Sequence, residues 1–209
     1  MGMITALHGF LGLPEDWDFL KRAGFEVNTP DLSEIPTEGD TLLGYSLGGR
    51  LALRALVNGA KYRRAVIVSS AISFEGDIEQ RRAQDEYWAG RFERGEWYSV
   101  MRDWTAQPIF GGHALPRREA DFDRTELARQ LREWSPAALP SIADRVGEIT
   151  IPVLWIAGSR DTKYVAEGHR AVAALTNCRL WIAEGAAHRV PWERPEEFAA
   201  QLRGFAEMT

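Results

Sequence analysis

The feature that most constrains the fold of this chain is a Gly-x-Ser-x-Gly motif between an apolar run and a helical pattern. It reads Gly44-Tyr45-Ser46-Leu47-Gly48 and follows the apolar run 41–43. A serine can stand in a sharp turn between a strand and a helix when glycines flank it, because they lack the β-carbons that would collide there. The helix that follows directs its first amide groups toward negative charge. The motif predicts a nucleophile elbow with Ser46 at its tip; the alternative is a glycine-rich turn with an incidental serine.

Short apolar runs alternate with helical patterns along most of the chain. Continuous runs of this kind are typical of buried strands in a parallel sheet. The runs are 4–7, 25–27, 41–43, 65–69, 153–157 and 180–183, and the helical patterns are 15–23, 48–58, 165–175 and 195–208. The alternation predicts an α/β fold with a doubly wound, mostly parallel sheet.

One stretch, from 72 to 147, interrupts this alternation. Tryptophan and phenylalanine recur there among many arginines, with no clear strand pattern. We interpret it as an inserted helical cap on a core formed by residues 1–71 and 148–209. An insertion between two strands of such a sheet normally lies over the carboxyl edge, where ligands bind. The alternative is a helical half of the core itself.

A serine hydroxyl needs a neighbouring imidazole to accept its proton before it can act at neutral pH. Among the four histidines, His188 follows the last apolar run and precedes the last helical pattern, as the chain order of serine, acid and histidine in such a triad requires. Asp161, in the loop after the run 153–157, is the predicted acid that orients the imidazole. As alternatives, Asp161 only caps the following helix, or Glu184 supplies the carboxylate.

The composition of the chain limits the classes of partner and the cellular location that we expect. The formal net charge of −5 gives no basic surface for nucleic acid or an anionic membrane, so a small-molecule partner is expected. Cys178 is the only cysteine, which together with the absence of a signal-peptide pattern or a bilayer-length apolar segment predicts a cytoplasmic protein. His113 and His169 have no ligand-spaced partners, so we expect no metal.

These motifs resemble the α/β-hydrolase superfamily, and more narrowly the 2-succinyl-6-hydroxy-2,4-cyclohexadiene-1-carboxylate synthases of menaquinone biosynthesis. The narrower resemblance is carried by three blocks, 44–50, 79–110 and 158–164. It implies an α/β-hydrolase fold and a cofactor-free lyase. In such an enzyme the triad initiates loss of a proton and the substrate then eliminates pyruvate. The alternative is a carboxylesterase or related hydrolase that acts on a small acyl substrate.

The resemblance also implies roles for residues outside the triad. The main-chain amides of Phe10 and Leu47 would form the oxyanion hole, as the loop after the first strand and the residue after the nucleophile do in this fold. Tyr45, Arg50, Arg81 and Trp104 would contact the substrate. Arginines suit a substrate with several carboxylates, because a guanidinium binds a carboxylate bidentately. The structural alternative is that Arg50 only covers a helix, Arg81 is solvated and Trp104 belongs to a core.

The chain also departs from the family pattern near its N-terminus. Members of the family usually have further strands before the His8-Gly9-Phe10 segment, and a longer stretch with a helix before the elbow. Here the segment 31–40 takes the place of that stretch. We therefore expect a trimmed sheet of about six strands, and a monomer or homodimer.

Overall fold

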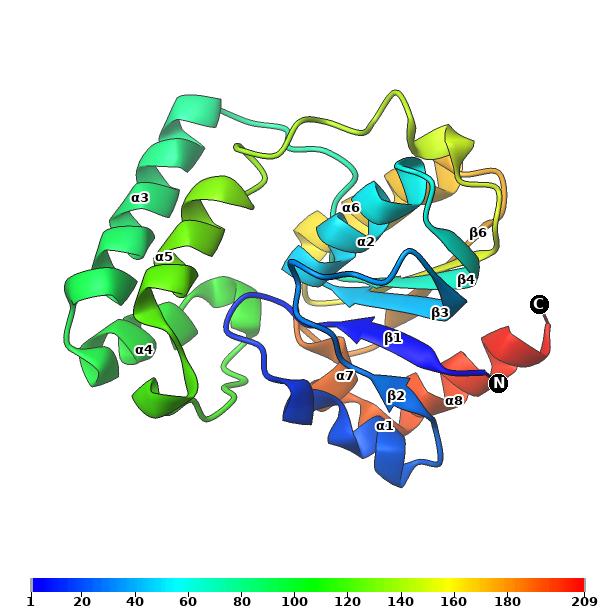
Figure 1. Ribbon diagram of the computed structural model, residues 1–209, viewed down its shortest axis with the longest axis horizontal. Helices are drawn as coiled ribbons and strands as arrows, with labels where there is room; N and C mark the ends of the chain where they lie inside the picture. Colours follow the sequence, from blue (N-terminus) through cyan, green and yellow to red (C-terminus); the bar gives the residue numbers. More distant parts are fainter. Residues whose placement is uncertain (1, 209) are drawn as a thin grey trace. The chain divides into compact units, whose positions relative to one another are not determined.

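The computed structural model describes residues 2–208, and the sheet within this range has six strands (Figure 1). They are β1 (Ile4–Leu7), β2 (Val27–Asn28), β3 (Glu38–Tyr45), β4 (Lys61–Val68), β5 (Val153–Gly158) and β6 (Cys178–Ala183). Their order in space is β2-β1-β3-β4-β5-β6, and all neighbours are parallel. The predicted α/β fold and the trimmed sheet of six strands are confirmed.

Several strand boundaries differ from the sequence prediction, among them the starts of β4 at Lys61 instead of residue 65 and of β6 at Cys178 instead of residue 180. The second strand was expected at 25–27, but β2 is Val27–Asn28 and Phe25 instead packs in the hydrophobic core. The third strand begins earlier than the apolar run at 41–43, because Glu38 pairs with Lys61 of β4. Both residues of that pair are exposed. Strand pairing between polar, solvent-exposed residues produces no apolar run, so the sequence did not indicate this early start of β3.

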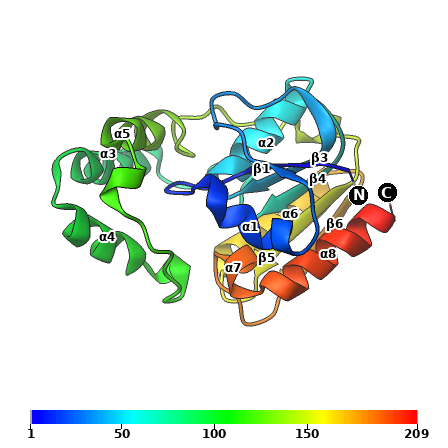
Figure 2. The same cartoon turned by 60° about the horizontal axis from the view of Figure 1, so that its bottom comes forward.

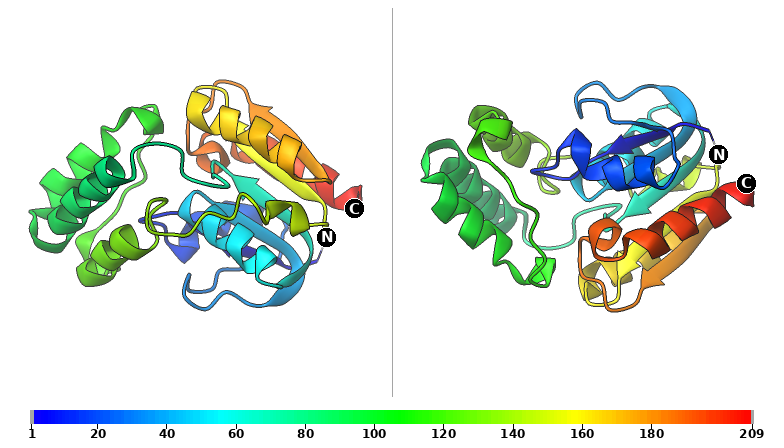
Figure 3. Two further views of the ribbon diagram at one scale, coloured as in Figure 1. Left: turned by 90° about the horizontal axis from the view of Figure 1, so that it is seen from above. Right: turned by 90° about the horizontal axis from the view of Figure 1, so that it is seen from below.

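Helices cover both faces of the sheet (Figures 2 and 3). The helices α2 (Leu47–Val57) and α6 (Thr162–Ala174) lie on one face, whereas α1 (Asp18–Arg22) and α8 (Pro195–Glu207) lie on the other. A short helix, α7 (Val190–Glu193), leads into α8. This is the doubly wound arrangement that the sequence predicted. Among residues 2–208 no helix combines the length and the apolar character needed to cross a membrane.

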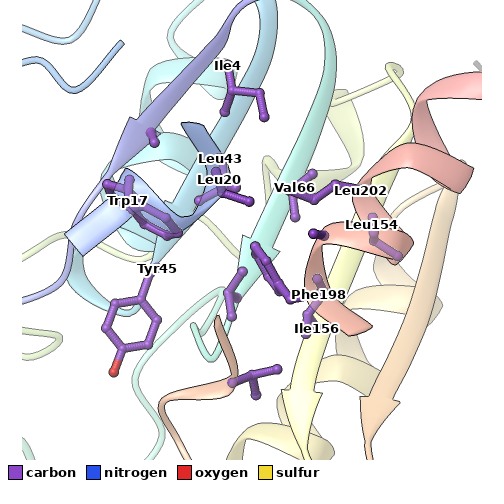
Figure 4. Close-up of a cluster of buried hydrophobic side chains, with 14 of the residues drawn as sticks. Ile4, Trp17, Leu20, Leu43, Tyr45, Val66, Leu154, Ile156, Phe198 and Leu202 are labelled. Carbon is purple, nitrogen blue, oxygen red and sulfur yellow. The ribbon is translucent and has the colours of Figure 1, made fainter. Parts of the chain in front are cut away.

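The hydrophobic core packs against neighbouring strands at residues that are paired in register. Leu43, Val66 and Leu154 are register partners on β3, β4 and β5, and all three are buried in one cluster. Phe198 and Leu202 of α8 belong to the same cluster (Figure 4). Because the strands are parallel and in register, the loops that follow β3, β5 and β6 leave from the same edge of the sheet.

The chain divides into two compact units, Met1–Ile72 with Ile142–Thr209, and Ser73–Ser141. Within the first unit, a guanidinium joins the beginning of the segment that starts at Ile142 to the end of α2. Arg145 donates to the carbonyl of Val57 and, at 3.2 Å, to the side-chain oxygen of Asn58 at the end of α2. Whether the second unit serves as a cap stays a prediction.

The second unit is helical and has an aromatic centre of its own. Its helices are α3 (Ile78–Arg94), α4 (Trp97–Thr105) and α5 (Arg124–Glu133). Each helix is directly preceded by an acidic N-cap residue whose carboxylate accepts one or two main-chain N–H groups of the first turn, which satisfies donors that have no partner within the helix. Ring pairs 5.0–6.3 Å apart join Trp88, Phe92, Trp97, Trp104, Phe110 and Phe122.

The single cysteine begins β6, and burial raises the pKa of the Cys178 thiol to about 11. Only the thiolate is alkylated, and a cysteine in an unfolded chain ionises near pH ~8.5. We expect iodoacetamide at pH 8 to label the urea-unfolded chain rapidly and the native protein slowly, with native labelling increasing toward pH 11. Since the native state holds this proton more tightly, the contribution of the group to stability decreases as pH increases from about 8.5 toward 11. Equal labelling rates at pH 8 would contradict this.

Candidate active site

Ser46 occupies a strained turn between β3 and α2. Its φ of 53° and ψ of −110° lie in a region that residues other than glycine rarely adopt, at a cost of about 1–3 kcal/mol. Two hydrogen bonds hold the turn. The Ser46 N–H donates to the Val68 carbonyl at 2.9 Å, and the Ser70 hydroxyl donates to the Ser46 carbonyl at 3.0 Å. The end of β4 therefore supports the elbow directly.

The two motif glycines are needed because backbone passes close to them. A β-carbon at Gly44 would lie 2.5 Å from the Gly48 carbonyl oxygen, and one at Gly48 would lie 2.5 Å from the His8 carbonyl oxygen. Both contacts are with backbone, which cannot move aside as the end of a flexible side chain can. The predicted reason for glycine at these positions is thus visible in the packing of α2 against the end of β1.

We expect Gly48→Ala to destabilise the protein, because the new methyl group would push the end of β1 away from α2. Such overpacking typically costs about 1–3 kcal/mol in the free energy of unfolding. The matched control is Gly204→Ala in α8, where a β-carbon would meet no atom within 4 Å and where alanine favours a helix by up to about 1 kcal/mol. Urea unfolding of both variants measures the difference, and similar stabilities would refute the close-approach argument.

His188 lies between Ser46 and Asp161. Its Nδ1 is 2.6 Å from Asp161 Oδ2, and its Nε2 is 3.1 Å from Ser46 Oγ. An ionised carboxylate only accepts hydrogen bonds, so Nδ1 carries the proton and Nε2 is left to accept the Ser46 hydroxyl proton. His188 is 3% exposed and Asp161 is 5% exposed, so the imidazole–carboxylate bond is shielded from water. The structure brings together the three residues that the sequence predicted as a triad.

The loops that carry Asp161 and His188 are hydrogen-bonded to each other. The Arg160 N–H donates to the Ala186 carbonyl at 2.9 Å, and the Ser159 hydroxyl accepts from the Gly185 N–H at 2.8 Å. A β-carbon at Gly158 would collide with the carbonyls of Ala186 and Ala187. Glycine at the end of β5 therefore lets the two loops approach closely enough for the short imidazole–carboxylate bond.

The geometry bears on both alternatives for the carboxylate. Asp161 does occupy the N-cap position of α6, but its side chain makes no capping bond and accepts from His188 instead. The N-terminus of α6 still favours a negative charge there through the helix dipole. Glu184 is exposed, and its main-chain carbonyl accepts from the Arg194 guanidinium at 3.2 Å.

Aromatic rings surround the imidazole of His188. The Tyr164 ring lies 4.7 Å from it and the Tyr45 ring 5.5 Å from it, centroid to centroid, and Trp192 packs edge-on against Tyr45 at 4.8 Å. Burial raises the pKa of the Tyr45 phenol far above its usual range, an effect that the neighbouring Arg189 guanidinium opposes. Tyr45 is therefore a neutral phenol at physiological pH, with its oxygen directed away from the core cluster (Figure 4).

Sequence reasoning missed Tyr164 and Arg189 as neighbours of the imidazole. Tyr164 lies three positions after Asp161, so it returns to the same side of the first turn of α6 and could have been found from that spacing. The buried Arg189 directly follows His188, and no local pattern indicates that its guanidinium lies beside the phenol of Tyr45.

The predicted oxyanion-hole residues belong to the elbow and to the loop that follows β1. Leu47 is the first residue of α2, directly after Ser46. The loop that contains Phe10 passes beside the elbow, since a β-carbon on Gly9 would lie 2.8 Å from the Tyr45 ring and 3.3 Å from the Ser46 β-carbon. Leu11, which continues this loop, has a φ of 59°. In residues 2–208 no group of three or more acidic, histidine or cysteine side chains could hold a metal ion.

The other predicted contact residues lie in different environments. Arg50 stands one turn into α2, and its Nε atom is buried. Arg81 is in the second unit, where its Nε donates to both carboxylate oxygens of the buried Asp85 at 2.9 and 3.0 Å. Trp104, also in that unit, packs against Trp88 at 5.0 Å. Substrate contact by these residues stays a prediction.

Comparisons with known proteins agree with this geometry. A model described as "Alpha/beta hydrolase family" matches residues 6–201. The protein named 2-succinyl-6-hydroxy-2,4-cyclohexadiene-1-carboxylate synthase from Citrobacter koseri is 31% identical over 92% of this chain and 88% of its own length. One of the same name from Serratia proteamaculans is 29% identical over 78% of this chain and 66% of its own, just under two thirds. The solved structure titled "Structure of MenH from S. aureus" superposes with a TM-score of 0.86 at 21% identity, covering 99% of this chain and 93% of that one. The chain therefore belongs to the α/β hydrolase family, and is an α/β-hydrolase-fold enzyme related to the 2-succinyl-6-hydroxy-2,4-cyclohexadiene-1-carboxylate synthases.

Proposed function

We propose that Ser46, His188 and Asp161 act together as a catalytic triad. The observation that carries this proposal is the continuous series of hydrogen bonds from Ser46 Oγ through His188 to Asp161, at 3.1 and 2.6 Å. His188 accepts the serine proton at Nε2, and the buried carboxylate stabilises the imidazolium that forms. The amides of Phe10 and Leu47 donate to developing oxyanion charge. The machinery requires no cofactor.

The proposed reaction is a lyase reaction on the succinyl-cyclohexadiene carboxylate precursor. With His188 as its base, the Ser46 oxygen removes a proton bound to a ring carbon of the substrate. The electron pair of that C–H bond forms a new ring double bond while a carbon–oxygen bond breaks. The leaving group departs as the enolate of pyruvate and takes up a proton, so atoms and charge balance without an acyl-enzyme. The 31% sequence identity to the Citrobacter koseri synthase, over 92% of this chain, supports this assignment.

The direct test is to supply purified protein with the enzymatically generated precursor. We expect the absorbance of the cyclohexadiene product and free pyruvate to appear together, in equal amounts. Well-folded protein that releases no pyruvate under conditions in which a relative does so would overturn the lyase assignment. A parallel reaction without protein measures spontaneous elimination of pyruvate.

A second candidate is a carboxylesterase or related hydrolase for small acyl substrates. The hydrogen bond between the Ser46 hydroxyl and His188 Nε2 favours it, because the same geometry suits attack of the serine oxygen on a carbonyl carbon. This function requires an acyl-enzyme. A burst of chromophore release from an activated ester, equal in amount to the enzyme and followed by slower turnover, distinguishes it from the lyase, for which no burst is expected.

If the substrate carries several carboxylates, removing the charge of Arg50 or Arg81 will weaken its binding. We expect Arg50→Gln and Arg81→Gln each to increase KM roughly tenfold to a hundredfold, since a hydrogen bond to a charged group contributes about 1.5–3 kcal/mol. The matched control is Arg82→Gln, which removes an exposed guanidinium of the same helix that pairs with Glu79 and should leave KM unchanged. Unchanged KM in both test variants would count against these contacts.

The proposal extends to the partner and the location. The formal net charge of −5 gives no basic surface for nucleic acid or an anionic membrane, so the partner we propose is a small, carboxylate-bearing molecule. We propose a cytoplasmic monomer or homodimer. The single cysteine, Cys178, is compatible with a reducing compartment.

A further inference from the structure

One carboxylate holds the main chain on both sides of His188. Glu193 Oε2 accepts from the Ala187 N–H at 2.9 Å, and Glu193 Oε1 accepts from the Arg189 N–H at 3.0 Å. Ala187 and Arg189 are the immediate neighbours of the imidazole-bearing residue. Each oxygen takes one N–H, so the carboxylate bridges the peptide groups that precede and follow the histidine.

The carboxylate is itself held in place by the short helix that carries it. The Glu193 N–H donates to the Arg189 carbonyl at 3.0 Å, which closes the turn of α7. The indole N–H of the adjacent Trp192 donates to the Asp16 carbonyl at 2.9 Å and so anchors this helix to the segment before α1. Glu193 is half-buried, which reduces competition from water for its two N–H partners.

We propose that Glu193 is a positioning residue that fixes the backbone of His188, so that the imidazole reaches Ser46 and Asp161 at the same time. The inference rests on the proposed triad and adds a fourth residue to it. The imidazole must meet two partners from loops after two different strands, at 2.6 and 3.1 Å. A displacement of about 1 Å in such an arrangement can cost roughly a hundredfold in rate.

The role requires a carboxylate and not merely a side chain of this size. An ionised carboxylate presents two acceptor oxygens, one to each N–H. A glutamine amide has the same shape but presents one oxygen and one NH₂ group, and the NH₂ group would face an N–H donor. Glu193→Gln therefore preserves the packing of α7 and breaks half of the bridge, leaving a buried N–H without an acceptor.

The test compares Glu193→Gln and Glu193→Ala with Glu196→Gln, which removes the same charge from an exposed position three residues further on. At a temperature below the unfolding transition of every variant, we expect kcat for pyruvate release to decrease roughly tenfold to a hundredfold in both Glu193 variants, with little change in KM. The control should retain wild-type kcat.

A second measurement does not depend on the substrate. In proton NMR the Nδ1 proton of His188, held in a 2.6 Å bond to Asp161, should give a far-downfield signal in wild type and in Glu196→Gln. We expect that signal to broaden or disappear in the Glu193 variants, together with faster hydrogen exchange at the Ala187 and Arg189 amides. A role limited to stabilising α7 would lower the melting temperature but leave this signal and kcat intact, and would overturn the inference.

These two measurements separate failure of the inference from failure of the proposed function. If wild type lacks activity on the precursor but shows the downfield signal and loses it in Glu193→Gln, the substrate assignment fails and the positioning role stands. If wild type is active and the Glu193 variants match it in kcat and in the signal, the positioning role fails and the function stands. Absence of the signal from wild type would contradict the triad on which both rest.

Discussion

Replacing Ser46 with alanine is expected to lower kcat for pyruvate release by roughly a thousandfold or more, as is typical when a residue of a cooperating triad is removed. The substitution removes the oxygen that lies 3.1 Å from His188 Nε2 and leaves the imidazole and its carboxylate in place. The residual rate would come from substrate binding and from the amides of the oxyanion hole.

The same variant should bind substrate almost as well as wild type, because the hydroxyl is expected to act on the reacting proton. Calorimetry of a stable substrate analogue with wild type and Ser46→Ala measures this. Ser33→Ala, which removes an exposed hydroxyl from a loop of the first unit, is the matched control and should keep full activity. A Ser46→Ala enzyme that retained a tenth of the wild-type kcat would show that the proton is removed by another group.

Asp161→Asn should reduce kcat by about 10⁴-fold, the size of effect that this change has in a serine protease. The physical reason is the tautomer of His188. An amide NH₂ facing Nδ1 favours the imidazole with its proton on Nε2, and that nitrogen then cannot accept the Ser46 hydroxyl proton. The side chain keeps its shape, so the buried site should stay folded.

Glu184→Gln provides the matched control for this prediction. Glu184 is the other carboxylate that the sequence offered, and it is exposed, so its amide variant should have wild-type kcat. Steady-state kinetics across a range of pH, with circular dichroism to verify folding, measures both variants. The opposite ranking, with Glu184→Gln impaired and Asp161→Asn active, would assign the acid to Glu184.

The parts of this site that the sequence predicted are those whose structure is determined by residues close by in the chain. The elbow follows from glycines within two residues of Ser46, and the places of Asp161 and His188 follow from their positions after apolar runs. Parallel strands bring loops that are distant in sequence to one edge of the sheet. The order of the strands along the chain was therefore enough to predict that Ser46, Asp161 and His188 lie close together.

The parts that sequence missed depend on contacts without a local signature. Glu193 looks like one more acidic residue near a helix start, and only the folded loop shows that its two oxygens face the amides around His188. The early start of β3 at Glu38 is likewise a ladder between exposed residues, which no apolar pattern marks. The bond from Arg81 Nε to Asp85, by contrast, could have been found from sequence, because opposite charges four residues apart on a helix are neighbours.

The position of the second unit in the chain has a consequence for how this enzyme can change. Residues 73–141 enter after β4 and leave before β5, yet these strands pair directly, from Ala65 with Val153 to Val68 with Ile156. The entropy lost in closing a loop increases only with the logarithm of its length, by about 0.6 kcal/mol for each doubling. Segments of very different size could therefore be exchanged between these two strands with little effect on the stability of the sheet, which leaves this stretch open to evolutionary replacement while the elbow and its partners stay unaltered.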